Sequence, residues 1–224
     1  MTTLTTAPLA PLLDRLFAEA QAPGSPEMTA ALAELSPEER VSLSASAVEA
    51  DYRRFYGLAR DAYLAVSRDT GRLLYMLVRS TGARSIVEFG TSFGISTLHL
   101  AAGIRDNGGG RIVTTEFELS KAARARENFA MGGLADLIEL REGDALQTLS
   151  HDLPERIDLV LLDGAKGLYP AVLTLLEERL HPGALLVADN ADRCPEYLQR
   201  VRAFTNGYVS VPFGDDVELS MRIG

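Results

Sequence analysis

The chain has 224 residues, of which 31 are acidic and 22 are lysine or arginine, and its formal net charge at pH 7 is −9. This balance argues against a nucleic-acid partner, because nucleic-acid binding is driven by basic surface. No apolar run approaches the ~20 residues of a transmembrane helix, and residues 1–6 lack the basic start and apolar block of a secretion signal. A single cysteine, Cys194, excludes an internal disulfide and a cysteine-rich zinc site. We expect a cytoplasmic protein that binds neither nucleic acid nor membrane.

Residues 1–65 are expected to form a helical accessory segment, or cap, beside the main domain. Residues 11–17 have helical spacing, and two prolines and a glycine within 23–26 interrupt it. Residues 36–39 read as a helix start with serine at the N-cap and glutamate closing a capping box. A longer helix is predicted over 52–64. These helices could cover a substrate, form the face of a homodimer or be purely structural, and the sequence leaves the three roles open.

The main domain is predicted over residues 66–224. It opens with a helix for which Ser67 is a candidate N-cap, and then strands and helices alternate. Such alternation is typical of a parallel sheet with helices on both faces. The predicted strands are 85–89, 111–116, 137–141, 157–162 and 184–188, and the predicted helices are 95–105, 119–131, 145–150, 170–180 and 195–204.

The chain ends in two predicted strands, around 208–212 and 217–222, joined by a short link. Strands this close in sequence form an antiparallel hairpin. The predicted fold class is therefore α/β: a Rossmann-like doubly wound sheet, mostly parallel, with a C-terminal antiparallel hairpin and an N-terminal helical cap.

The loop after the first strand carries a candidate ligand site. The strand ends in Glu88, and two glycines four apart, Gly90 and Gly94, follow it. Glycine accepts positive φ and lets a ligand approach the backbone, and open parallel sheets bind ligands beyond the carboxyl ends of their strands. The dinucleotide fingerprint needs a glycine where this chain has Ser92. The spacing instead resembles motif I of class I S-adenosylmethionine-dependent methyltransferases; an ordinary strand–helix turn is the alternative.

Acids also follow the second and third strands. Glu116 lies at the tip of the second strand, where a carboxylate can accept two ribose hydroxyls. Glu118 instead suits the start of the next helix, whose dipole favours a negative charge. Asp144 follows the third strand and is either an N-cap for the helix from Ala145 or a contact to adenine, as the matching loop is in the methyltransferases.

The fourth and fifth strands end in Asp163 and in Asp189-Asn190. Adjacent parallel strands bring these groups to one edge of the sheet, where two carboxylates and an amide oxygen supply half of an octahedral shell for a cation such as Mg²⁺. Two uncompensated acids would repel each other, so a cation or a basic neighbour is expected. Lys166 is the competing explanation, because it could neutralise one acid as a salt bridge.

From about residue 66 to the C-terminus the chain resembles the catechol and caffeoyl-CoA O-methyltransferases, a cation-dependent group that acts on small molecules. Five segments support the resemblance: Glu88–Thr91 with Gly94, Glu116, Asp163–Tyr169, Asp189-Asn190 and Pro212–Asp216. The chain departs from the group at Gly164-Ala165, where the group commonly has bulkier or charged residues, which puts the packing beside adenine in question.

The resemblance implies a role for each matching residue. Asp163, Asp189 and Asn190 would bind a divalent cation, Lys166 would act as general base, and the cofactor would be S-adenosylmethionine. The cofactor contacts expected on this basis are Ser67, Glu88, Gly90, Ser92, Gly94, Ser96, Glu116, Asp144, Ala145 and Asp163.

The sequence therefore predicts an S-adenosylmethionine-dependent O-methyltransferase that moves a methyl group to a hydroxyl of a small aromatic, catechol-like or polyphenolic acceptor, with Mg²⁺ or another divalent cation. One alternative is a metal-independent methyltransferase in which Asp163 and Asp189 are structural. A nicotinamide-dependent oxidoreductase is disfavoured by Ser92. A non-catalytic S-adenosylmethionine-binding protein is the third alternative. Nothing in the sequence encodes which acceptor is used.

Overall fold

The computed structural model describes residues 1–22, 33–36, 38, 52–214 and 216–224. The helix start predicted at 36–39 falls partly outside these residues, and so does Asp215 of the hairpin link.

A seven-stranded sheet lies at the centre of the described chain, with strand order β3-β2-β1-β4-β5-β7-β6. The first five strands in this order, β3, β2, β1, β4 and β5, pair in parallel with their neighbours, and β7 runs antiparallel to both β5 and β6. The predicted Rossmann-like sheet with a terminal antiparallel hairpin is confirmed. The strands are β1 (Ser85–Phe89), β2 (Arg111–Glu116), β3 (Ile138–Glu142), β4 (Ile157–Leu162), β5 (Leu180–Ala188), β6 (Tyr208–Phe213) and β7 (Val217–Arg222).

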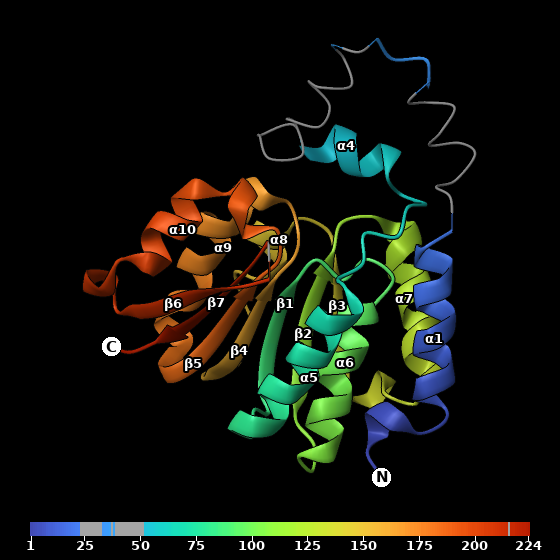
Figure 1. Cartoon of the computed structure of the whole chain (residues 1–224), viewed down its shortest axis with the longest axis horizontal. Helices are drawn as coiled ribbons and strands as arrows, with labels where there is room; N and C mark the ends of the chain where they lie inside the picture. The colour runs from blue at the N-terminus through green and yellow to red at the C-terminus, as the bar shows by residue number, and fades with distance from the viewer. Residues whose placement is uncertain (23–32, 37, 39–51, 215) are drawn as a thin grey trace.

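Helices cover both faces of the sheet (Figure 1). One face carries α5 (Arg68–Thr81), α6 (Ile95–Asp106) and α7 (Leu119–Met131), with α1 (Leu9–Ala20) packed on the last two. The other face carries α8 (Ala145–Thr148), α9 (Tyr169–Leu176) and α10 (Pro195–Arg202). The central strands β1 and β4 are buried on both sides because of this covering, which explains why most of their residues are apolar.

One further helix, α4 (Tyr52–Leu58), lies above the loops at one end of the sheet (Figure 1). Short 3₁₀ turns complete the described elements: η1 (Thr3–Thr5), η2 (Ala135–Leu137), η3 (Lys166–Leu168), η4 (Glu177–Arg179), η5 (Ala191–Arg193) and η6 (Phe204–Asn206).

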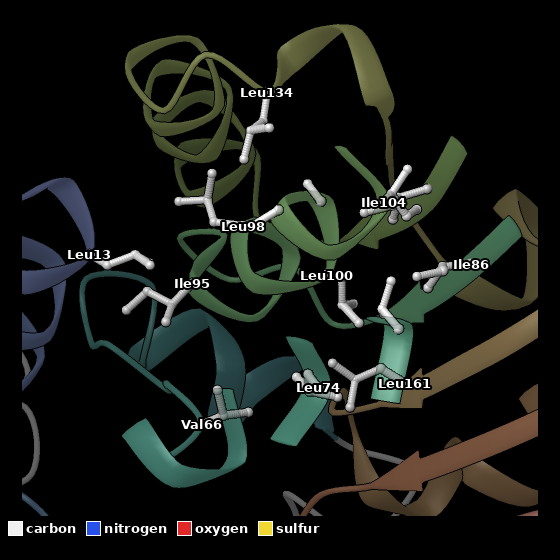
Figure 2. Close-up of a cluster of buried hydrophobic side chains, with 14 of the residues drawn as sticks. Leu13, Val66, Leu74, Ile86, Ile95, Leu98, Leu100, Ile104, Leu134 and Leu161 are labelled. Atoms are coloured by element: carbon white, nitrogen blue, oxygen red, sulfur yellow. The ribbon is translucent and has the colours of Figure 1, made fainter. Parts of the chain in front are cut away.

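The first helix belongs to the same hydrophobic core as the sheet. Figure 2 shows Leu13 of α1 on the side of Ile95 and Leu98 of α6, with Leu74 of α5 and Ile86 of β1 in the same cluster. Five apolar residues of α1 are buried in this way, one helical face of the amphipathic segment. The apolar face of α1 is thus used within the chain; a domain boundary at residue 65 and a homodimer through the N-terminal helices stay predictions.

Several element ends differ from the prediction. Helix α4 stops at Leu58, and residues 62–67 run on without helical structure towards the sheet. Helix α9 ends at Leu176, because the chain tightens into the 3₁₀ turn η4. Strand β5 starts at Leu180, which pairs with Ile157 before the register shifts. The predicted N-cap of α5 is confirmed: the Ser67 side chain accepts the Thr70 N–H at 2.9 Å.

In the described part of the chain no helix is both long and apolar enough to cross a lipid bilayer.

Candidate functional site

The carboxyl ends of β1, β4 and β5 meet at one edge of the sheet. Phe89 pairs with Leu162, and Leu162 pairs with Ala188. The backbone continues this register, since Asp163 N donates to Phe89 O at 2.8 Å and Asp189 N donates to Leu162 O at 2.9 Å. The pairing brings Asp163 and Asp189 side by side, as the order of the strands predicted.

The two glycines of the β1–α6 loop are required by close contacts. Gly90 has φ +104°, and a Cβ there would lie 2.5 Å from the carbonyl oxygen of Asp163. Gly94, with φ +87°, is the N-cap of α6, and a Cβ there would overlap the ring of Phe129. Both positions demand a residue without a side chain. The loop is therefore pressed against the end of β4.

Glu88 lies beneath this loop rather than in a cavity wall. Its side chain is fully buried, and it accepts the hydroxyls of Ser96 at 2.6 Å, Thr97 at 2.5 Å and Thr114 at 2.6 Å. Burial raises the pKa of this carboxyl to about 7, although the three hydroxyls oppose the rise. These contacts tie β1, β2 and the start of α6 together. In this structure the hydrogen bonds of Glu88 and Ser96 support the loop. Direct contact of either residue with a cofactor stays a prediction.

Glu116 stands at the end of β2 and lines a cavity. Its two carboxylate oxygens accept backbone N–H groups, from Ser92 at 2.7 Å and from Glu118 at 2.8 Å. Burial raises the pKa of Glu116, and these N–H groups and Lys121 counteract the rise. The ordered carboxylate keeps further lone pairs with which it can accept a ligand's hydroxyls.

Asp144 has the first of the two roles left open for it, and its contact with adenine stays a prediction. Its side chain caps α8 by accepting the Leu146 N–H at 2.9 Å, and it also lines the cavity. Arg53 of α4 donates to its other oxygen at 3.1 Å. The bond from Arg53 joins α4 to the end of β3 and holds the helix over the cavity.

The first cavity has an apolar wall and a few polar groups, which is the composition of a small-molecule site. It brings together six of the predicted cofactor contacts. The residues that line it include Tyr52, Tyr56, Leu64, Phe89, Gly90, Ser92, Glu116, Phe117, Lys121, Asp144, Ala145, Asp163, Gly164, Ala165 and Leu168.

The question raised by Gly164-Ala165 has a steric answer. A Cβ at Gly164 would overlap the ring of Phe89, so this position needs glycine where the ring packs beneath it. Ala165 is buried and lines the first cavity. Gly164 therefore makes room for the Phe89 ring, and Ala165 contributes a small side chain to the cavity wall.

A second cavity adjoins the first, and Tyr56, Leu64 and Asp163 line both. It is lined by all four residues predicted to bind the metal or act as the base. Ser67, a predicted cofactor contact, lines this second cavity and not the first. Gly94 lines neither, in accordance with its role in the turn, and Ser96 borders a small recess beside the loop. The four predicted metal or base residues are Asp163, Lys166, Asp189 and Asn190.

Lys166 is nearly buried and binds the acidic edge. Its Nζ donates to Asp163 Oδ1 at 3.0 Å and to the Tyr169 hydroxyl at 2.9 Å, and that hydroxyl donates to the backbone oxygen of Asp189 at 2.8 Å. Burial raises the pKa of Asp163, and Lys166 opposes the rise. Burial and the neighbouring Asp163 raise the pKa of Asp189 to about 7. The two acids form a strained pair that one ammonium only partly neutralises.

The donors at this edge fit a hard divalent cation. Across the described residues, no three His, Cys, Asp or Glu side chains form a metal-binding group. Mg²⁺, however, is commonly held by one or two carboxylates and completes its shell with water and substrate. Asn190 donates its amide N–H to Asp216 at 3.1 Å, so its amide oxygen is the atom available as a ligand. Two buried carboxylates and an amide oxygen match that chemistry.

Three contributors to the site were not assigned from the sequence. Tyr52 and Tyr56 reach the first cavity from α4, and the Tyr56 hydroxyl donates to Gly164 O at 3.3 Å. Lys121, on α7, lines the same cavity. The two tyrosines come from a segment far from the loops in sequence, whereas Lys121 lies five residues after Glu116, and no local motif marks any of the three. Tyr169, the last residue of the segment Asp163–Tyr169, is buried and accepts a hydrogen bond from Lys166.

Comparison with known proteins gives a consistent family match. The O-methyltransferase family model matches residues 39–194, which is more than half of the chain. A catechol O-methyltransferase from Mycobacterium tuberculosis is 36% identical over 130 residues, 58% of this chain and 58% of that protein. One from Niastella koreensis is 32% identical over 133 residues, 58% of this chain and 59% of that protein. The chain thus matches about three fifths of the length of these relatives.

Solved structures agree over a longer span. The O-methyltransferase TomG from Streptomyces achromogenes, determined in complex with SAM, superposes with a TM-score of 0.65 at 27% identity. The alignment covers 90% of this chain and 97% of that one.

Replacing Glu88 with glutamine should remove a pH dependence of the free energy of unfolding. Because the folded pKa of about 7 lies above the unfolded value, ionising this buried carboxyl costs stability as the pH rises towards 7. Glu88→Gln cannot ionise, so its stability relative to the wild type should rise by up to about 3 kcal/mol between about pH 5 and pH 8. Urea unfolding across this range measures the difference, and a difference that is independent of pH would contradict the assignment.

Proposed function

The chain belongs to the O-methyltransferase family, and on that premise we propose that it transfers the methyl group of S-adenosylmethionine to a hydroxyl of a small aromatic, catechol-like acceptor, with help from a divalent cation. The observation that carries the proposal is the position of Asp163, which lines both cavities and bonds to Lys166. A cofactor in the first cavity and an acceptor in the second would meet at this residue.

The first cavity supports the cofactor half of the proposal. Glu116 would accept the ribose hydroxyls, and the backbone around Gly90 and Ser92 would lie close to the methionine part. Asp144 and Ala145 would border the adenine, which also suits the apolar wall of this cavity. TomG, which aligns over most of this chain, is described in complex with SAM, and that supports the same cofactor here.

The second cavity supports the acceptor half. When bound, the sulfonium supplies an already activated methyl group, and the cation lowers the pKa of an acceptor hydroxyl. Asp163, Asp189 and Asn190 would hold the cation and so fix the acceptor's orientation, which is the protein's main task in a transfer of this kind. The catechol O-methyltransferases among the relatives favour a vicinal aromatic diol, whose two oxygens can bind one cation.

Lys166 would take the proton from the acceptor hydroxyl. In this structure its Nζ lies 3.0 Å from Asp163 Oδ1. A cation bound to Asp163 would compete for that carboxylate and would release the Lys166 side chain towards the acceptor hydroxyl. With its proton on Lys166, the acceptor oxygen would form a bond to the methyl carbon as the carbon–sulfur bond breaks, which would leave S-adenosylhomocysteine as a neutral thioether.

A metal-independent methyltransferase is the second candidate, and one observation favours it. Lys166 already forms a 3.0 Å ion pair with Asp163, so the acidic edge has a counter-charge without a metal. The experiment below separates the two candidates.

Methyl transfer from labelled S-adenosylmethionine to a panel of catechols should require Mg²⁺ and stop with a chelator. Asp189→Asn keeps the shape of a metal ligand but removes its charge, and should reduce transfer by at least about tenfold. Because Asp189 lines the second cavity and not the first, S-adenosylhomocysteine should still bind this variant. Calorimetry provides that control. Transfer that persists unchanged with chelator would contradict the metal and leave the second candidate standing.

Lys166→Met should lower kcat by about 10²–10⁴ while leaving the affinity for S-adenosylhomocysteine close to that of the wild type, because the proton acceptor is lost and the first cavity is not altered. The loss should be smaller at high pH, where the acceptor hydroxyl ionises without a base. Initial rates measured across pH with saturating catechol test this. A variant that keeps full kcat at neutral pH would remove Lys166 from the mechanism.

A further inference from the structure

The chain contains only two lysines, Lys121 and Lys166, among its 22 basic residues, and the other 20 are arginines. Both lysines are buried, with exposed fractions of 2% and 6%. Lysine is almost never buried without a partner or a function. Lys166 has a place in the proposed reaction. Lys121 lines the first cavity and has none so far.

Two physical effects oppose a charge at Lys121. Burial lowers the pKa of its ammonium. The residue also lies in the first turn of α7, where the helix dipole disfavours a positive charge. Within the described chain its ammonium forms no hydrogen bond and no ion pair. Its Nζ lies over the ring of Phe93, 5.4 Å from the ring centroid. The three N–H donors of an ammonium are therefore available to the cavity that this side chain lines.

Four acids oppose the effect of burial by raising the pKa of Lys121, namely Glu116, Glu118, Asp61 and Asp163. Of these, Glu116 at the end of β2, Glu118 at the N-cap of α7 and Asp163 at the end of β4 line the first cavity together with Lys121. The influence is mutual for Glu116: burial raises the pKa of that carboxyl, and Lys121 counteracts the rise. Burial raises the pKa of the Tyr56 hydroxyl, and the charges of Asp163 and Glu116 add to the rise.

We propose that Lys121 is a second ribose-site residue, which holds Glu116 ionised and donates a hydrogen bond to the vicinal diol that Glu116 accepts. The inference rests on the proposed function, because it takes the ligand of the first cavity to be a nucleoside cofactor. The two roles are complementary: a carboxylate accepts hydroxyl protons, and the hydroxyl oxygens keep lone pairs that an ammonium can fill. Lysine suits this place because its compact charge fits where a planar guanidinium would need more room.

The test is calorimetric binding of S-adenosylhomocysteine between about pH 6 and pH 8.5, with Lys121→Met compared to the wild type. Without the ammonium, Glu116 takes up a proton at higher pH, and a protonated carboxyl accepts ribose hydroxyls poorly. The variant should therefore bind about tenfold more weakly near the acidic end and recover part of the loss as the pH rises. The wild-type affinity should stay nearly constant over the same range.

Two further variants separate this role from a structural one. Arg124→Met removes a positive charge from the same helix, outside the first cavity, and should bind as the wild type does. Glu116→Gln should bind weakly without pH dependence, and adding Lys121→Met to it should change the affinity far less than in the wild type. Equal losses in both backgrounds, or a loss independent of pH, would overturn the proposal.

A measurement on the unmutated chain avoids any folding defect of the variants. Because there are two lysines, ¹³C-lysine labelling gives two side-chain Cε signals, which Lys166→Arg assigns by elimination. Saturating S-adenosylhomocysteine should shift the Lys121 signal. Tight binding with no shift of that signal would overturn the role of Lys121 alone, whereas a wild-type protein that does not bind the nucleoside would overturn the proposed function as well.

Discussion

The burial of two neighbouring carboxylates at the ends of β4 and β5 is the constraint on which the rest of the site depends. Asp163 and Asp189 are placed together by the register of parallel strands, and neither can move away without breaking a backbone bond to the sheet. Their mutual repulsion is only partly offset by Lys166. Two carboxylates that are largely shielded from water are suited to bind a cation. A bound cation in turn suits a reaction in which the acceptor must lose a proton.

Close packing links this acidic edge to the loop after β1. The absence of a side chain at Gly90 lets the loop touch the carbonyl of Asp163, and Gly164 makes room for the ring of Phe89. Glu88 secures the loop from below through the hydroxyls of α6 and β2. A displacement of the loop would therefore change the position of Asp163. The two cavities adjoin, since Tyr56, Leu64 and Asp163 line both of them.

Much of the fold and part of the site could be predicted from the sequence. The buried strands are apolar runs, and acids at their ends must meet when parallel strands are neighbours, so Asp163 and Asp189 could be paired before their positions were known. Helix ends were less predictable: α9 tightens into a 3₁₀ turn because of the following strand pairing, which no local pattern encodes.

Contacts between segments that are distant in the sequence could not be predicted from it. The hydroxyls that bind Glu88 come from three positions on two elements, and their convergence depends on the packing of α6 on β1 and β2. Lys121 looks like an ordinary charged residue near a helix start, and only the fold shows it buried beside Glu116. The amphipathic face of α1 was visible in the sequence, but its partners, α6 and α7, were not.

The most direct test of the account is the binding of Mn²⁺, as a probe for Mg²⁺, followed by electron paramagnetic resonance in the presence of S-adenosylhomocysteine. The account predicts one site in the wild type that is lost when Asp163 and Asp189 are both changed to asparagine, and a wild-type protein that binds no Mn²⁺ would contradict it.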